Sequence, residues 1–213
     1  MDFKWQIEAP ACIMISGMTA SGKTQLTKKL LMRCNEVFDK PVDHILWCYT
    51  ESQPQLEAEL RQNADAPIQF HEGFPENFEN PDPSKHMILV LDDMLHLCKQ
   101  DKMQQVFVRG SHHQNISVIY LTQSCFAPGQ RTISLQCKYI ALMRNPRENS
   151  NYQILGRQMN GGKNCPCLEG AMRENANKPY SYVVLDYSQS QNDKMRIRNS
   201  FFPEDMIFYV KKG

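Results

Sequence analysis

The sequence predicts an α/β fold in which helices flank a mainly parallel β-sheet. Short apolar runs recur at residues 11–16, 87–91 and 116–121, each bounded by polar residues. Runs of this length and composition are typical of buried strands, and helical patterns separate them along the chain. Because strands that alternate with helices favour parallel pairing, we expect helices on both faces of the sheet.

The elements of the first half follow from the spacing of apolar residues. After the strand at 11–16, apolar residues recur every three to five positions through residues 26–38, which predicts an amphipathic helix. A second strand is expected at residues 44–49, followed by a short helix at 54–62 with a proline in its first turn. The proline-rich segment after it predicts a loop, with a short strand at 68–71.

The second half continues the same alternation. The strongest strand, residues 87–91, precedes a predicted helix and then the strand at 116–121. Residues 160–177 are rich in Gly and Asn, which predicts an irregular loop. Helices are expected at 103–113 and 146–159, and further strands at 139–143, 181–186 and 206–210.

Length and hydropathy indicate one soluble domain. We expect a single domain over residues 1–213, with its core at about 11–187 and a C-terminal extension, 188–213, with room for an edge strand. No apolar run approaches the roughly 18 residues of a membrane span, and the N-terminus lacks a signal-peptide pattern. We therefore expect a soluble intracellular protein, without a membrane partner, whose cysteines are reduced.

Charge is distributed unevenly along the chain. Residues 1–101 contain nine Lys or Arg and 16 Asp or Glu, a balance of −7, whereas residues 102–213 contain 15 and seven, a balance of +8. A basic half can contact a polyanion while the other half does something else. The alternative is that the uneven distribution of charge arose by chance and that folding brings the acidic and basic residues together on the surface.

One motif fits the Walker A pattern G-x-x-x-x-G-K-[ST]. An apolar strand precedes it and an amphipathic helix follows it, which is the context that such a loop requires. Glycines let the backbone wrap a phosphate, and backbone N–H groups at the helix N-terminus supply positive potential. Lys23 would contact the β- and γ-phosphates of ATP, and Thr24 would bind Mg²⁺. The ATP-binding residues expected from the motif are Gly17, Met18, Thr19, Ala20, Ser21, Gly22, Lys23 and Thr24.

Three polar side chains at strand ends complete the predicted site of a P-loop NTPase. Asp92 ends the strand at 87–91, where a Walker-B aspartate helps to hold Mg²⁺. Asp93 follows and is a candidate general base, with helix capping as its alternative role. Gln123 ends the strand at 116–121 and is a candidate sensor near the γ-phosphate or the attacking water, with hydrogen bonding to backbone as its alternative role. A sensor there predicts an additional strand between the P-loop strand and the Walker-B strand.

Arginines in the basic half have two possible roles. An arginine finger neutralises transition-state charge on a neighbouring subunit's γ-phosphate, whereas a DNA-binding arginine contacts backbone phosphate. A solvated surface position is the alternative for each. The candidates are Arg109, Arg131, Arg144 and Arg147. Residues 161–164 and the basic stretch 194–198 are candidate DNA-contacting loops, the second being equally a strand whose basic residues face solvent.

Five segments carry a resemblance to a known family. Together with the sequence between them, these segments make the resemblance run from about residue 11 to residue 205. The chain resembles the HerA/FtsK-type DNA-packaging ATPases of large and mid-sized DNA viruses. It is most similar to those of Polinton/Maverick elements and adintovirus-like viruses, relatives of the poxvirus packaging ATPase. The segments are GMTASGKT, ILVLDD, VRGSHHQNISVIYLTQS, RTISLQCKYIALMRNPRE and YVVLDYSQSQNDKMRIRNSFFPED.

The resemblance implies a fold, an activity and partners. The expected fold is an additional-strand (ASCE, RecA-like) P-loop core that assembles as a homo-oligomeric ring, with six subunits expected. ATP would bind between subunits, and its hydrolysis would translocate double-stranded DNA into a preformed capsid at the site of virion assembly in the infected cell. Capsid or portal vertex proteins are the implied partners, and ATP and Mg²⁺ the cofactors.

The same resemblance assigns roles to individual residues. It makes Lys23 and Thr24 phosphate and Mg²⁺ ligands, Asp92 the Walker-B acid and Gln123 the sensor. Arg109 matches the arginine ahead of the sensor strand and is the first choice for the finger. Asp93 departs from the superfamily, which usually has glutamate at the catalytic position, so the strength of hydrolysis stays open.

Two other functions fit parts of the sequence. A P-loop phosphotransferase acting on a small molecule would need an arginine-rich lid, which the sequence lacks. A nucleotide-gated DNA-binding scaffold with weak turnover is compatible with Asp93. A GTPase would need a base-reading N-K-x-D motif, and the chain has none.

Overall fold

The computed structural model describes residues 4–75, 80, 82–94, 106–107, 114–127, 130–145 and 149–210. The strands are β1 (Cys12–Ser16), β2 (His44–Tyr49), β3 (Ile68–Glu72), β4 (Met87–Asp92), β5 (Ile116–Thr122), β6 (Tyr139–Met143), β7 (Tyr182–Asp186) and β8 (Ile197–Arg198). The helices are α1 (Lys23–Leu31), α2 (Cys34–Val37), α3 (Pro54–Asn63), α6 (Arg131–Gln136), α7 (Asn149–Met159) and α8 (Pro166–Asn175).

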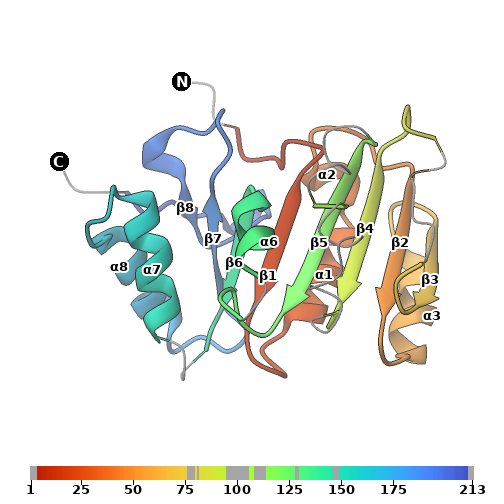
Figure 1. The fold of residues 1–213 in the computed structure, drawn as a ribbon, viewed down its shortest axis with the longest axis horizontal. Helices are drawn as coiled ribbons and strands as arrows, with labels where there is room; N and C mark the ends of the chain where they lie inside the picture. Colours follow the sequence, from red (N-terminus) through yellow and green to blue (C-terminus); the bar gives the residue numbers. More distant parts are fainter. Residues whose placement is uncertain are drawn as a thin grey trace.

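The strands form one eight-stranded sheet in the order β3-β2-β4-β5-β1-β6-β7-β8 (Figure 1). Parallel pairing places Cys12 of β1 beside Val118 of β5, and Met87 of β4 beside Ile116 of β5. The additional strand predicted between the P-loop strand and the Walker-B strand is therefore confirmed as β5. Strands β7 and β8 run antiparallel to their neighbours.

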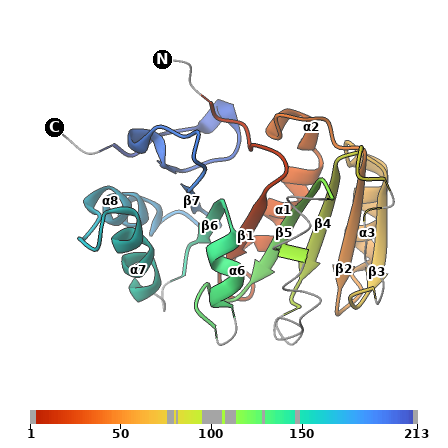
Figure 2. The same ribbon diagram turned by 45° about the horizontal axis from the view of Figure 1, so that its top comes forward.

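Helices cover both faces of the sheet, as predicted (Figure 2). On one face α1, α2 and α3 pack Leu30, Cys34 and Leu60 against alternate residues of the strands. On the other face α6, α7 and α8 pack residues such as Ile133 and Leu168 against the intervening ones. Burial on both faces explains why the central strands are continuous apolar runs rather than alternating ones.

The carboxyl ends of the parallel strands β1, β2, β4, β5 and β6 meet at one edge of the sheet, the lower edge in Figure 1. The loop between β1 and α1 lies at this edge. Ligands of open α/β sheets bind at this edge, because the helices that follow the strands direct their N-termini toward it. The fold thus positions the predicted site residues near one another.

Three sequence predictions about secondary structure are wrong. Residues 160–177 contain α8, which begins with Pro166 and buries Leu168 and Ala171; tertiary burial outweighs the local Gly and Asn content. Residues 206–210 form only an isolated bridge, Arg198 to Phe208, and no strand. The helix predicted at 26–38 is broken after α1 and resumes as α2. Most of the helix predicted at 103–113 lies outside the described residues.

The basic stretch 194–198 does not present all its charges to solvent. Arg198 on β8 is fully buried, its Nη1 donating to the backbone oxygen of Trp5 at 2.7 Å. Its Nη2 lies 4.0 Å from the buried Asp186 carboxylate. The prediction of a solvent-facing basic strand is therefore wrong for Arg198, which ties β8 to β7 and to the N-terminal segment.

Two general expectations concern the whole chain. The described cysteines are all free thiols, as predicted. Within the described residues, no helix has the length and apolar character that a membrane span requires.

Candidate nucleotide-binding site

The loop between β1 and α1 needs glycine at two positions. A Cβ on Gly17 would lie 2.5 Å from Cβ of Met143 and 2.6 Å from Oγ of Ser21, so a side chain has no room there. Gly22 has a φ of 100°, in the left-handed region, and directly precedes α1. Ala20 also adopts a positive φ, 61°. Both glycines of the Walker A motif are therefore required by the shape of the loop.

The N-terminus of α1 is prepared for an anion. No side chain caps it, and its first turn contains no acidic residue. The leading N–H groups of a helix lack intrahelical partners and carry partial positive charge. The Ser21 hydroxyl is also buried, with no hydrogen-bond partner among the described residues. Buried polar groups in native proteins are almost always paired, so these unpaired donors indicate a site for a phosphate.

Lys23 bends back over the loop. Its Nζ donates to the backbone oxygens of Gly17 at 2.7 Å and Met18 at 3.0 Å. Burial lowers the pKa of Lys23, and the nearby carboxylates of Asp92 and Asp93 oppose that shift. The ammonium is thus held between the phosphate loop and the Walker-B strand.

Two adjacent carboxyl groups end strand β4. Burial and, to a lesser extent, the charge of Asp93 raise the pKa of Asp92 to about 6, whereas the charge of Lys23 acts in the opposite direction. Asp93 is exposed and has a φ of 53°. Aspartate tolerates the left-handed region better than most residues. The tight turn directs consecutive carboxylates into different surroundings, one partly buried and one facing solvent.

Asp92→Asn is expected to stabilise the ligand-free protein at neutral pH. Because the folded-state pKa of Asp92 is raised, the native state loses stability as pH rises from the ordinary value of 3.8 to about 6. Asparagine removes this cost, which reaches about 3 kcal/mol for a shift of about two units. Urea unfolding at pH 4 and pH 7.5 measures it: the variant should gain stability only at the higher pH. A variant that is less stable than wild type at pH 7.5 would contradict the assigned burial of charge.

One cavity of about 250 Å³ brings seven of the predicted site residues together. Lys23 and Thr24 line it from α1, the Asp92–Asp93 pair from β4, and Gln123 from the end of β5. Of the remaining loop residues, Thr19 and Ala20 line it as well, whereas Gly17, Met18, Ser21 and Gly22 do not. Residues 23 and 123 are 100 positions apart in sequence, and only the order of the sheet makes them neighbours.

Sequence reasoning missed one wall of this cavity. The last residue of β2, Tyr49, and the segment after it contribute this wall, the latter with Thr50, Glu51 and Gln53. Since β2 is parallel to β4, its carboxyl end had to lie at the same edge. Ligands bind at the carboxyl ends of parallel strands, so the residues after every predicted strand are candidates for the site. Applied to the strand at 44–49, this rule would have identified the missing wall.

Two of the four candidate arginines belong to the described residues, and the other two do not. Arg109 and Arg147 lie outside the described residues. Arg131 begins α6 with an exposed side chain, and Arg144 follows β6. Neither Arg131 nor Arg144 lines the nucleotide cavity. Among the described residues, no arginine therefore lines this cavity.

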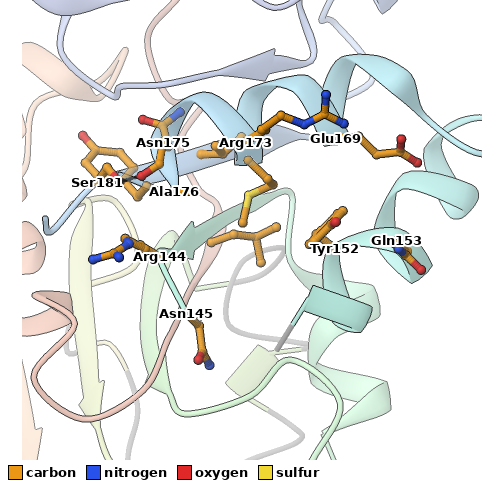
Figure 3. A pocket seen from close by; sticks show the side chains of 13 residues that line it. Arg144, Asn145, Tyr152, Gln153, Glu169, Arg173, Asn175, Ala176 and Ser181 are labelled. Atoms are coloured by element: carbon orange, nitrogen blue, oxygen red, sulfur yellow. Dashed lines mark hydrogen bonds between the residues drawn. The ribbon is translucent and has the colours of Figure 1, made fainter. Parts of the chain in front are cut away.

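Arg144 lines a second, larger cavity of about 490 Å³ (Figure 3). It lies between β6, β7 and helices α7 and α8, and its walls include Asn145, Tyr152, Arg173 and Ser181. Figure 3 shows Arg144 and Asn145 on one side and Tyr152 and Arg173 on others. A small third cavity, which shares Asn145 and Tyr152 with it, extends to Gly17.

The cavity residues fit Mg²⁺. This ion prefers oxygen ligands and usually takes only one or two from the protein, the rest coming from phosphates and water. The Thr24 hydroxyl and the Asp92 carboxyl provide such a pair on the wall of one cavity. Among the described residues there is no group of three or more His, Cys, Asp or Glu that would hold a metal alone, as expected for an ion bound together with its nucleotide.

Comparison with known proteins gives a fold. No protein-family model matches the chain, and no curated protein matches it. Among solved structures, it is similar to the genome packaging NTPase B204 from Sulfolobus turreted icosahedral virus 2 in complex with ATP-gammaS. The TM-score is 0.50 at 12% identity, covering 89% of this chain and 96% of that one. The chain has the fold of an additional-strand P-loop NTPase.

A second similar structure supports the same fold. The cytoplasmic domain of the Type VII secretion ATPase EccC from Thermomonospora curvata aligns with a TM-score of 0.52 at 15% identity. The match covers 85% of this chain but only 24% of that one. This chain thus spans about a quarter of the length of that EccC chain.

Proposed function

We propose that the protein is an ATPase. The observation that carries the proposal is the single cavity lined by a Walker A lysine and threonine, two strand-end carboxylates and a strand-end amide. Each group matches a role in phosphoryl transfer to water. The neighbour B204 was solved with ATP-gammaS, which agrees with ATP as the ligand.

The geometry suggests a role for each residue in hydrolysis. Lys23 neutralises charge on the β- and γ-phosphates, and Thr24 with Asp92 would hold a Mg²⁺ ion, which would supply further positive charge against the phosphates. Asp93 accepts a proton as water attacks the γ-phosphorus, and Gln123 orients that water. The bond from the γ-phosphorus to its bridging oxygen breaks, which yields ADP and inorganic phosphate.

We further propose that hydrolysis drives double-stranded DNA into a viral or virus-like capsid. Two observations support this: the fold is similar to that of a genome packaging NTPase, and residues 102–213 have a balance of +8. A translocase must hold any sequence, so it should contact phosphate rather than base edges. A ring of subunits, six by the family resemblance, would supply in trans the arginine that the described part of the cavity lacks.

The test is steady-state ATP hydrolysis with and without long double-stranded DNA, at 50 mM and 200 mM salt. We expect DNA to stimulate turnover, and the stimulation to fade at high salt because phosphate contacts release counterions. Turnover that is robust but indifferent to DNA at both salt concentrations would contradict translocation. It would leave the ATPase proposal intact.

One observation favours a second candidate, a nucleotide-gated DNA-binding scaffold with weak turnover. Asp93 is shorter than glutamate, and its backbone is fixed at a φ of 53°, which limits how far its carboxylate reaches toward the γ-phosphate. ATP binding without turnover, in the presence of DNA, would support the scaffold over the motor.

A further inference from the structure

Tyr180 lies in an unusual conformation beside the phosphate loop. It occupies the turn between α8 and β7 with a φ of 58°, a region that bulky residues rarely adopt. Its side chain is 70% exposed. Strained, exposed residues persist where their surroundings fix them, and they concentrate at ligand sites.

The neighbours of Tyr180 fix its backbone. The Ser181 hydroxyl lies 2.7 Å from the backbone oxygens of both Asn175 and Lys178. The backbone N–H of Arg144 donates to the oxygen of Ser181 at 2.9 Å. The turn is therefore anchored to α8 on one side and to the end of β6 on the other, which gives the backbone of Tyr180 a defined position.

That position is against the Walker A loop. A Cβ built on Gly22 would lie 3.2 Å from Cδ1 of Tyr180 and 3.4 Å from its Cβ. The tyrosine thus packs directly over the glycine that precedes α1. Two segments 158 residues apart in sequence, one of them the phosphate loop, meet at this contact.

The direction of a bound nucleotide follows from the sheet order. The γ-phosphate end is set by Asp92, Asp93 and Gln123, which come from β4 and β5 on one side of β1. Strands β6 and β7 lie on the other side of β1. A nucleotide that runs across the loop therefore directs its ribose and base toward the ends of β6 and β7, where Tyr180 precedes β7.

We propose that Tyr180 is the stacking platform for the purine base of the bound nucleotide. The inference rests on the proposed ATPase function and adds the group that binds the nucleoside half. An exposed aromatic ring gains a favourable contact when a base covers it. Stacking uses the face of the base and not its edge, so ATP and GTP should bind with similar affinity.

The test compares two probes, Mg·ATP and inorganic tripolyphosphate with Mg²⁺, by calorimetric titration. Tyr180→Ala is expected to weaken ATP binding about tenfold and to leave tripolyphosphate binding unchanged, since that probe has no base. Tyr180→Phe should restore the affinity for ATP, because it keeps the ring. In Tyr180→Trp, ATP should quench the indole fluorescence and tripolyphosphate should not.

Two outcomes would overturn the proposal. If Tyr180→Ala lost affinity equally for both probes, Tyr180 would only support the phosphate loop. If Tyr180→Ala bound ATP with unchanged affinity, Tyr180 would not contact the base. If Arg173→Ala, in the second cavity (Figure 3), weakened ATP binding while Tyr180→Ala did not, the base would bind there instead. Failure of the wild-type protein to bind either probe would contradict the ATPase function itself. The experiment therefore distinguishes failure of the Tyr180 proposal from failure of the proposed ATPase function.

Discussion

Lys23→Ala is expected to weaken ATP binding on the order of 100-fold and to reduce hydrolysis to background. A hydrogen bond to a charged group contributes about 1.5–3 kcal/mol, and each 1.4 kcal/mol is about tenfold in affinity. The lysine is shared between two phosphates, so more than one such interaction is lost. Calorimetric titration with Mg·ATP and a coupled phosphate-release assay would measure both effects.

Lys40→Ala is the matched control, because it removes an equally flexible cation from an exposed position outside the cavity. We expect it to bind ATP like the wild type. Lys23 donates to two loop carbonyl groups without nucleotide, so thermal unfolding of both variants must show that the fold is retained. An unchanged ATP affinity in a folded Lys23→Ala protein would refute the P-loop assignment.

Asp93→Asn is expected to slow hydrolysis by about 10²–10⁴-fold, the usual contribution of a positioned general base, while ATP binding stays near the wild-type value. Asparagine has nearly the same size and cannot accept the proton. It also tolerates the φ of 53° found at this position, so the substitution changes the chemistry of the side chain and keeps the turn. Single-turnover hydrolysis, with ATP in saturating amounts, separates this effect from binding.

Glu51→Gln is the comparison for this prediction. Glu51 lines the same cavity from the segment just after β2. Its side chain is one methylene group longer than that of Asp93. We expect its loss to affect hydrolysis much less. If Asp93→Asn retained full turnover while Glu51→Gln lost it, the base would be Glu51, and the assignment drawn from the Walker-B position would be wrong.

The central strands could be predicted because the apolar character of their residues indicates that they are buried. Strands β1, β4 and β5 are buried on both faces, so each is a short run of apolar residues that is visible in the sequence. The Walker A loop was equally visible, because Gly17 and Gly22 satisfy local requirements of space and φ. The additional strand followed from the polar residue that ends β5.

The periphery of the sheet could not be predicted in the same way. Helix α8 has Gly and Asn around and within it, and what stabilises it is the burial of Leu168 and Ala171 under a sheet that the local sequence does not reveal. Strand β8 is two residues long and contains Arg198, which contacts Asp186 on the neighbouring strand β7 and Trp5 at the other end of the chain. Such elements form because of their neighbours, and intrinsic propensity says little about them.

The alternation of elements, the phosphate loop and the polar residues at the strand ends could all be predicted from the amino-acid sequence. These are local properties, set by hydrophobic periodicity and by the conformations that glycine allows. Four features arise only in the folded protein: which strand ends meet, that Glu51 lines the cavity, that burial raises the pKa of Asp92 to about 6, and that Tyr180 lies against Gly22. The reason is that each depends on contacts between residues tens to more than a hundred positions apart, which exist only once the sheet has ordered its strands.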